Sequence, residues 1–149
     1  RKTQDTKAIK EAVAQLREVE LSEQRFAEYR RAAAALTRDP GDAAAHAEVG
    51  RYLCFFRDQW AEGLPHLLLG GDAVLRGLAQ AELAAARAID APRKVALGDQ
   101  WWDAADSAPD EAQGLYRGRA AHWYREALPE LTGLTETRVK HRLDQLASP

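Results

Sequence analysis

The sequence has no methionine and only one cysteine, Cys54, among its 149 residues. A single cysteine excludes an internal disulfide, and its place in the apolar run 52–56 is typical of a small core residue rather than a reactive thiol. β-Branched residues are scarce, and no stretch alternates apolar and polar residues over a strand's length, which argues against a sheet protein. No apolar run approaches the roughly 20 residues that span a bilayer, and no signal peptide is evident. Because the chain opens at Arg1 without any methionine, we expect it to be a piece of a larger protein.

Helix-forming residues are abundant instead. Alanine is conspicuous, and Ala, Leu, Glu, Arg and Gln are the residues that lose least on entering a helix. Hydrophobic residues make up 46% and charged residues 30% of the chain, the balance of a folded globular or helical-repeat protein. The formal net charge of -2 gives no long-range attraction to nucleic acid or to an acidic membrane. We therefore expect an all-α protein that binds no nucleic acid and inserts into no membrane.

Residues 1–38 predict one long N-terminal helix. The segment contains no Gly or Pro, and its apolar residues recur in steps that keep one helical face continuous: Ile9, Val13, Leu16, Val19, Phe26, Tyr29, Ala33 and Leu36. One interpretation is a core-facing helix that breaks near Leu21 and restarts with Ser22 as its cap. The other, which we favour, is a continuous helix that pairs in coiled-coil fashion with an upstream segment.

Turn signals divide residues 42–149 into six further helices. Pro40 and Gly41 end the first helix, and Asp42 can cap a second that runs to about Phe56. The following helices are expected over residues 60–68, 73–89, 91–105, 110–128 and 135–146, with Asp72 and Thr135 as caps. We expect these seven helices to form a single domain over residues 1–149, with residues 42–149 as a repeat-like bundle.

One segment occurs twice. Residues 60–67 (Trp-Ala-Glu-Gly-Leu-Pro-His-Leu) match residues 124–131 (Tyr-Arg-Glu-Ala-Leu-Pro-Glu-Leu) in the aromatic, the acid, the small residue, Leu-Pro and the final Leu. The preceding helices also match, because an aliphatic residue and a glycine occur together at Val49–Gly50 and at Leu97–Gly98. The pattern indicates two diverged copies of a helical hairpin, with a longer segment between the helices of the second copy.

Leu97–Gly98, followed by Ala120, Tyr124, Ala127 and Leu128, resembles the small-and-aromatic pattern of tetratricopeptide and Sel1-like repeats. The resemblance implies stacked helical hairpins, in which the glycine lets two helices approach and the aromatic fills the gap between neighbouring pairs. The period differs from the usual 34 residues of the tetratricopeptide repeat.

The segments 50–54, 63–65, 97–102 and 119–129 together are similar to a helical module of large multidomain proteins of planctomycete bacteria. This similarity covers nearly the whole chain. It implies a bacterial protein with neighbouring domains and an exported, extracytoplasmic location, and it implies no activity.

The best candidates for catalysis are Cys54, His122 and Asp99, as nucleophile, base and orienting acid. Nothing in their spacing brings them together, and we expect no catalytic site. The four histidines, at positions 46, 66, 122 and 141, do not show the i, i+4 spacing of metal ligands, and there is no second cysteine. We expect neither a metal nor a cofactor.

Trp101, Trp102 and Trp123 are the candidate contacts for a partner or ligand. Aromatic residues at helical spacing are most often core, but adjacent tryptophans point about 100° apart on a helix, so one of the pair can lie at a rim. The predicted function is a non-catalytic scaffold that binds a protein partner or positions neighbouring domains, with the N-terminal helix as a second contact surface, including for self-association. The alternatives are a glycan- or peptide-binding module that uses exposed tryptophans, and a diverged enzyme domain.

Overall fold

The computed structural model describes residues 2–85 and 90–148, and these are arranged in two compact units, Arg1–Gly71 and Asp72–Pro149. All regular structure in the described residues is helical, so the predicted all-α class is confirmed. The expectation of a single domain did not include this division, which falls at the predicted stop after Gly70. None of the helices in the described part of the chain has the length and apolarity needed to cross a membrane.

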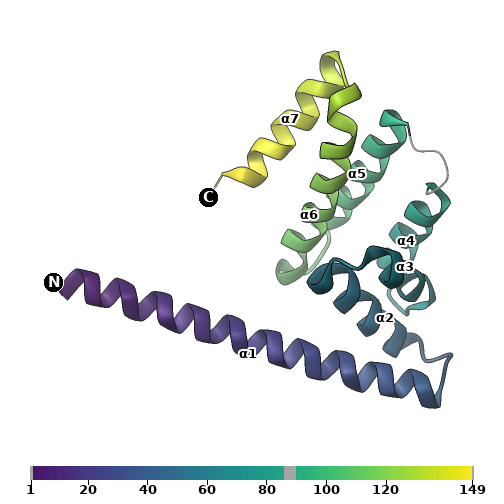
Figure 1. Ribbon diagram of the computed structural model, residues 1–149. Coiled ribbons are helices and arrows are strands. Elements are labelled where there is room, and N and C mark those ends of the chain that lie inside the picture. Colours follow the sequence, from purple (N-terminus) through teal and green to yellow (C-terminus); the bar gives the residue numbers. More distant parts are fainter. Residues whose placement is uncertain (1, 86–89, 149) are drawn as a thin grey trace. The chain divides into compact units, whose positions relative to one another are not determined.

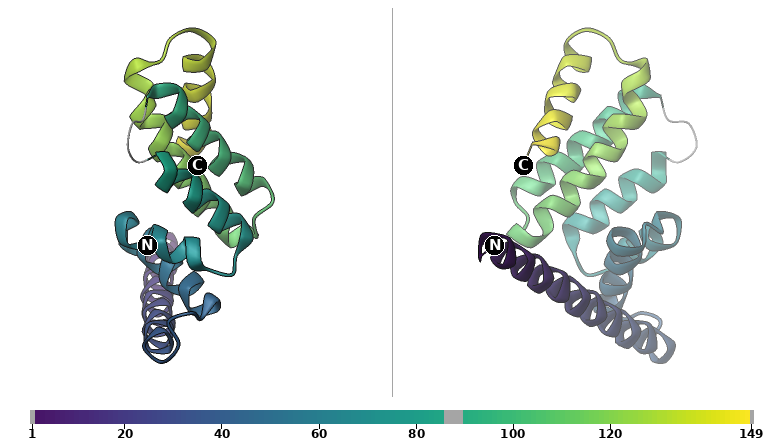
Figure 2. Two further views of the ribbon diagram at one scale, coloured as in Figure 1. Left: turned by 90° about the vertical axis from the view of Figure 1, so that its right-hand side faces the viewer. Right: turned by 60° about the vertical axis from the view of Figure 1, so that its left-hand side comes forward.

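Unit 1 consists of α1 (Lys2–Arg38), α2 (Ala43–Arg51), η1 (Tyr52–Phe56) and α3 (Trp60–Leu69) (Figure 1). The favoured continuous helix is confirmed, because α1 runs through Ser22 without a break. At 1.5 Å per residue it is about 55 Å long. Only its C-terminal part packs against α2 and η1, and its N-terminal part projects beyond them (Figure 2).

The core of unit 1 is small. Ala32 of α1 is buried against Ala45 and Val49 of α2, and Tyr29 and Leu36 pack around them. Asp42 caps α2 as predicted, since its carboxylate accepts a hydrogen bond from the Ala45 N–H at 3.0 Å. The small alanine side chains let α1 lie close to α2, and this contact fixes the C-terminal half of α1.

The helix expected to run from Ala43 to about Phe56 changes character in its last turn. Tyr52–Phe56 form a π-helical turn, which widens the helix by one residue per hydrogen-bonded ring. Asp58 follows in the left-handed region, with φ of 52°, and its carboxylate accepts a hydrogen bond from Trp60 Nε1 at 2.9 Å. The π turn was not predicted, because its apolar residues also suit an α-helix.

Unit 2 consists of α4 (Ala73–Ala85), α5 (Ala91–Asp106), α6 (Asp110–Ala127), η2 (Leu128–Glu130) and α7 (Gly133–Ala147). The helices α5 and α6 lie side by side along their length (Figures 1 and 2). The expected continuation of α4 to Ile89 lies outside the described residues. Asp72 caps α4 as predicted, because its carboxylate accepts from the Leu75 N–H, and Asp90 caps α5 in the same way.

The last helix begins two residues before the predicted cap. α7 starts at Gly133, whose φ of +65° only glycine adopts easily, and Thr135 lies inside the helix. The assignment of Thr135 as a cap was therefore wrong. Val139 on this helix is fully buried, in line with its predicted inward position.

Two glycines at matching places in the sequence repeat mark close helix approaches. A Cβ atom at Gly50 of α2 would lie 2.8 Å from the backbone nitrogen of Leu67 in α3. A Cβ atom at Gly98 of α5 would lie 2.5 Å from the ring of Tyr124 in α6. The matching glycines thus have the same role in both hairpins. The residues they approach, Leu67 and Tyr124, do not correspond in the sequence repeat.

We predict that Gly98→Ala destabilises the protein by about 1–3 kcal/mol, because the new methyl group overlaps the buried Tyr124 ring. Gly118→Ala in α6 is the matched control. A Cβ atom there meets nothing within 4 Å, so that substitution should stabilise by about 0.5–1 kcal/mol through helix propensity. Urea unfolding followed by circular dichroism measures both. Equal effects of the two substitutions would contradict the packing role of Gly98.

Candidate interaction surface

The three predicted tryptophan contacts differ in exposure. Trp101 is 0% exposed and its ring meets that of Tyr116 edge-on at 5.5 Å, so it offers no surface to a partner. Trp102 and Trp123 are half-buried. The candidate tryptophan surface is therefore reduced to Trp102 and Trp123.

Arginines of unit 2 lie over both of these rings. The guanidinium groups of Arg117 and Arg142 lie 5.3 and 5.0 Å from the Trp102 ring centre. The guanidinium of Arg119 lies 5.1 Å from the Trp123 ring centre. Cation–π contacts of this kind compete with a sugar ring or a peptide side chain for the same face. This arrangement gives the ligand-binding alternative little free aromatic area in unit 2.

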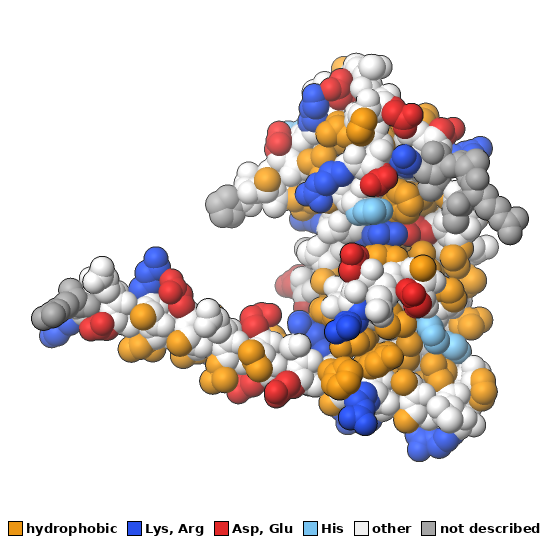
Figure 3. Space-filling view, in the orientation of Figure 1, with side chains coloured by type: hydrophobic (Ala, Val, Ile, Leu, Met, Phe, Trp, Pro, Cys, Tyr) orange, Lys and Arg blue, Asp and Glu red, His pale blue; other side chains and the backbone are white. Residues whose placement is uncertain are grey.

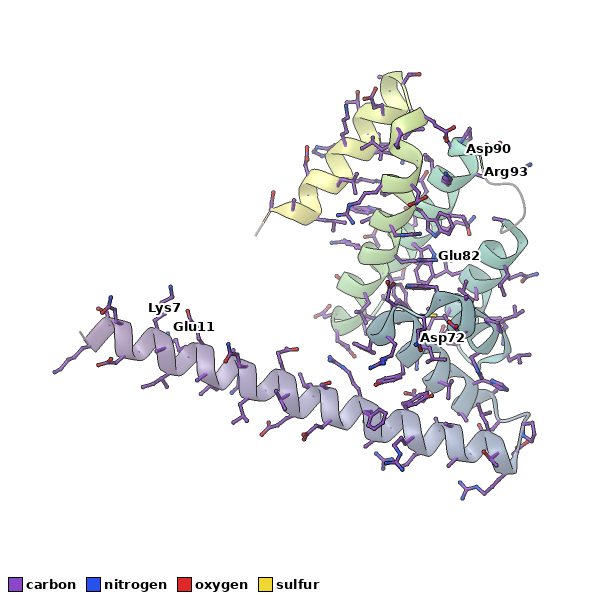
Figure 4. All side chains as sticks on the ribbon, in the orientation of Figure 1. Lys7, Glu11, Asp72, Glu82, Asp90 and Arg93 are labelled. Atoms are coloured by element: carbon purple, nitrogen blue, oxygen red, sulfur yellow. The ribbon has the colours of Figure 1, made fainter. Side chains whose placement is uncertain are left out.

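A buried carboxylate, which sequence reasoning missed, explains the position of these rings. Glu82 of α4 is 3% exposed and extends toward α5 and α6 (Figure 4). Its Oε1 accepts hydrogen bonds from Trp101 Nε1 at 2.7 Å and from Trp123 Nε1 at 2.8 Å. Arg119 donates Nε to Oε1 at 2.8 Å and Nη2 to Oε2 at 2.5 Å.

The signal for Glu82 was present in the sequence. Leu75, Leu78, Ala79 and Glu82 follow the i, i+3, i+4, i+7 spacing of one helical face, and the first three are buried. An acid on the apolar face of a helix needs a buried cationic partner, because an unpaired buried charge is very costly. Arg119 satisfies that need.

Asp99 of α5 is the centre of a second, more exposed cluster. It accepts hydrogen bonds from the Tyr124 hydroxyl at 2.7 Å, from both terminal nitrogens of Arg138, and from Arg142. Burial acts to raise the pKa of Asp99, but the hydrogen bonds from Arg138 and Tyr124 outweigh it, and the net pKa lies below the ordinary value. Burial, followed by the hydrogen bond to Asp99, raises the pKa of Tyr124. The cluster joins α7 to the α5–α6 pair.

The residues considered for catalysis are divided between the two units, with Cys54 in unit 1 and Asp99 and His122 in unit 2. Cys54 lies in unit 1 and is 2% exposed, so its thiol is closed to a substrate. Asp99 is engaged by Tyr124 and the two arginines, and the exposed ring of His122 lies edge-on to Trp123 at 5.1 Å. In the part of the chain that the structure describes, no group of three or more His, Cys, Asp or Glu side chains could hold a metal ion.

Two histidines of unit 1 form a direct pair that the sequence did not predict. His46 Nδ1 and His66 Nδ1 lie 2.8 Å apart, and His46 Nε2 lies 2.9 Å from the carbonyl oxygen of Pro40. Since a carbonyl only accepts, neutral His46 carries its proton on Nε2 and accepts from His66 at Nδ1. Burial, and then the proximity of His46, lower the pKa of His66. The pair joins α2 to α3 only while one of the facing nitrogens lacks a proton.

The largest exposed apolar feature of unit 1 lies on α1. Every residue from Lys2 to Gln24 is exposed, including Ile9 at 63% and Leu16 at 59%. Ile9, Val13 and Leu16 follow steps of four and three and therefore share one face, visible as a row of orange side chains along α1 (Figure 3). We call Ile9, Val13 and Leu16 the α1 stripe. The sequence analysis expected the N-terminal helix to present a contact surface, and the structure shows which of its residues are exposed.

An aromatic groove continues from the α1 stripe. Tyr29 of α1 stacks with Tyr52 of η1, with ring centres 4.5 Å apart, and the Phe26 ring lies 6.2 Å from each of them. They border an open groove of about 590 Å³ that is lined by Ser22, Glu23, Phe26, Tyr29, Tyr52, Leu53, Arg57 and Gln59. On the other side of Tyr52, Arg25 lies 4.3 Å from the ring centre of exposed Phe56. Together, the stripe and the groove form a half-apolar, half-polar surface of the kind that binds proteins.

Comparison of the chain with protein-family models, with curated proteins and with solved structures finds no significant match. The function is therefore inferred from the contacts and the exposed surfaces described above.

We predict that Glu82→Gln destabilises the protein by about 3 kcal/mol, because it removes the carboxylate from a buried ion pair with Arg119. Glu136→Gln is the matched control. It removes the partner of Lys140 in a surface i, i+4 pair, whose contribution is about 0.3–0.5 kcal/mol. Thermal and urea unfolding measure both changes. A Glu82→Gln protein as stable as the control would disprove the central role of this carboxylate.

We predict that protonation of His66 lowers the free energy of unfolding of the protein at acid pH. Its pKa is lower in the folded than in the unfolded state, where it is about 6.5. The unfolded state therefore binds more protons as the pH falls below 6.5, and the free energy of unfolding decreases until the pH passes the folded-state pKa. The contribution of this histidine is complete above pH 6.5 and has a slope of at most about 1.4 kcal/mol per pH unit.

His66→Asn tests this prediction, because its amide can still donate near the position of Nδ1 but does not titrate. Urea unfolding between about pH 5 and pH 8 should show a smaller loss of stability in acid for His66→Asn than for the unchanged chain. His141→Asn, at an exposed position on α7, is the control and should keep the original pH dependence. Identical pH profiles for all three proteins would exclude His66 as the cause.

Proposed function

We propose that this chain is a non-catalytic helical interaction module, and that its binding surface is the α1 stripe together with the aromatic groove. The observation that carries the proposal is the exposure of every residue from Lys2 to Gln24 on a helix that has an ordered apolar face. An amphipathic helix normally buries such a face against a partner.

Helix energetics support a partner for this part of α1. A helical segment of this size without tertiary contacts is only marginally stable in water, since nucleation is costly and most helix stability in proteins comes from packing. A partner that covers the α1 stripe supplies that packing. The partner surface that fits is another amphipathic helix, because apolar residues repeat along α1 at helical spacing.

In this proposal the rest of the molecule is a scaffold of the tetratricopeptide-like kind. The α2–α3 and α5–α6 pairs are the two diverged hairpins, and Gly50 and Gly98 permit the close approach within each. Such modules bind partners or position the neighbouring domains of a larger protein. The half-buried Trp102 remains the candidate contact of the ligand-binding alternative.

Affinity capture tests the proposal with two substitutions on opposite faces of α1. Leu16→Glu introduces a charge into the stripe, and Ala14→Glu introduces the same charge about 160° around the helix. Proteins captured by the unchanged chain and by Ala14→Glu should be lost with Leu16→Glu, because a buried charge is costly. Circular dichroism confirms that both variants keep their helix content. Capture that is unchanged by Leu16→Glu but lost with Trp102→Ala would instead support the ligand-binding alternative.

A further inference from the structure

We infer that the α1 stripe is covered by α1 of a second copy of this chain, with the two helices antiparallel. The inference rests on the proposed function and names the partner of the same surface. It goes beyond the general possibility of self-association, because the distribution of charge along α1 selects both the partner and its direction.

The two ends of the stripe carry opposite charge. The segment 2–10 contains three lysines and one aspartate, for a net charge of +2, at Lys2, Asp5, Lys7 and Lys10. The segment 18–23 contains three glutamates and no basic residue, for a net charge of -3, at Glu18, Glu20 and Glu23. All of these residues are exposed. Two parallel copies would therefore place lysines beside lysines, whereas two antiparallel copies place the basic end of each beside the acidic end of the other.

One antiparallel register satisfies the apolar and the charged residues together. When the pair is centred between Ala12 and Val13, Ile9 of each copy lies opposite Leu16 of the other. Lys2 then lies opposite Glu23. The apolar centre and the charged ends are thus in phase, as in antiparallel helix pairs whose flanking charges set the direction.

The same register connects the stripe to the aromatic groove. Glu23 and Phe26 line the groove, and Phe26 is an exposed ring. The ammonium group of Lys2 from the second copy therefore comes next to a carboxylate and an aromatic ring, both of which attract it. The groove and the stripe are in this way parts of one continuous contact.

The size of the contact sets its strength. The overlap runs from Lys2 to Glu23, about 33 Å of helix, and contains five large apolar residues per copy, of which three form the α1 stripe. Asp5 lies opposite Glu20 in this register, a like-charge pair that opposes association. A short contact of this kind belongs with small, reversible interfaces, so we expect a dissociation constant of about 10–100 µM.

Sedimentation equilibrium of the purified full chain over a wide concentration range is the first test. We expect a reversible monomer–dimer equilibrium that weakens as salt increases, because the end charges attract and salt screens them. Leu16→Glu should weaken the dimer at least about tenfold, while Ala14→Glu leaves it within about twofold. Association that strengthens with salt would contradict the antiparallel charge pairing.

Charge reversal adds a second, independent readout. In this register Lys2 lies opposite Glu23 and Lys7 lies opposite Glu18. Lys2→Glu combined with Lys7→Glu should therefore weaken the dimer, and so should Glu18→Lys combined with Glu23→Lys. The four substitutions in one chain restore opposite charges between the two ends and should restore the dimer. Recovery is not expected for a variant that has simply lost its helix, so this result separates pairing from folding.

Disulfide trapping tests the direction of the helices. Ile9→Cys mixed with Leu16→Cys should form a mixed disulfide, and neither variant should cross-link efficiently with itself. A parallel pair would give the opposite result, because each position would then meet its own copy. The unchanged chain is the control, since its only cysteine, Cys54, is buried.

Failure of the inference can be distinguished from failure of the proposed function. A chain that stays monomeric at all concentrations, but whose captured proteins are lost with Leu16→Glu, overturns the second copy as the occupant and leaves the α1 stripe as a binding surface. A monomeric chain whose captured proteins do not depend on Leu16 overturns both. A dimer that Leu16→Glu does not weaken overturns the inference by placing the contact elsewhere.

Discussion

In unit 2, the carboxylate of Glu82 lies where α4, α5 and α6 meet, and four N–H groups donate to it. Burying a charge is costly, so this arrangement is tolerated only when the partner and the donors are all in place. The requirement fixes the rotation of three helices at once, because Trp101, Arg119 and Trp123 have to point to one spot. Of the tryptophans predicted as ligand contacts, Trp101 and Trp123 donate hydrogen bonds to Glu82. Arginines lie over the rings of Trp102 and Trp123.

Unit 1 is built in a different way. Its buried apolar residues are alanines of α1 and α2 together with Val49 of α2, Cys54 of η1, and Leu64 and Leu67 of α3. It contains no buried ion pair comparable to Glu82–Arg119 among the described residues. The aromatic rings of α1 and η1 line an open groove instead of filling a closed core. The N-terminal half of α1 has an apolar face and no tertiary contact. The buried ion pair is thus a feature of unit 2, and the exposed apolar face of α1 is a feature of unit 1.

Much of the fold follows from local chemistry that a sequence displays directly. Asp42 and Asp72 were recognised as caps, and the long first helix followed from the absence of Gly and Pro. The misplaced cap at Thr135 shows the limit of this approach, since a glycine can begin a helix as well as end one. The His46–His66 pair and the choice of partners for Glu82 depend on contacts between residues distant in sequence, which no local pattern encodes. The continuous stripe of α1 was visible, but a periodic pattern is identical whether the face is buried or exposed.

That last ambiguity is informative about function. If α1 served only to pack on α2, its apolar residues would not need to extend N-terminal to Tyr29, because the packing on α2 begins near that residue. The apolar period nevertheless continues back through Leu16 and Val13 to Ile9, and every residue from Ile9 to Gln24, about 23 Å of helix, is exposed. Apolar side chains in water give no stability to an isolated helix, and exposed patches of this kind usually mark interaction sites. The simplest physical reason for the stripe is a surface supplied from outside the unit, and the opposite charges at its two ends make a second α1 the best complement.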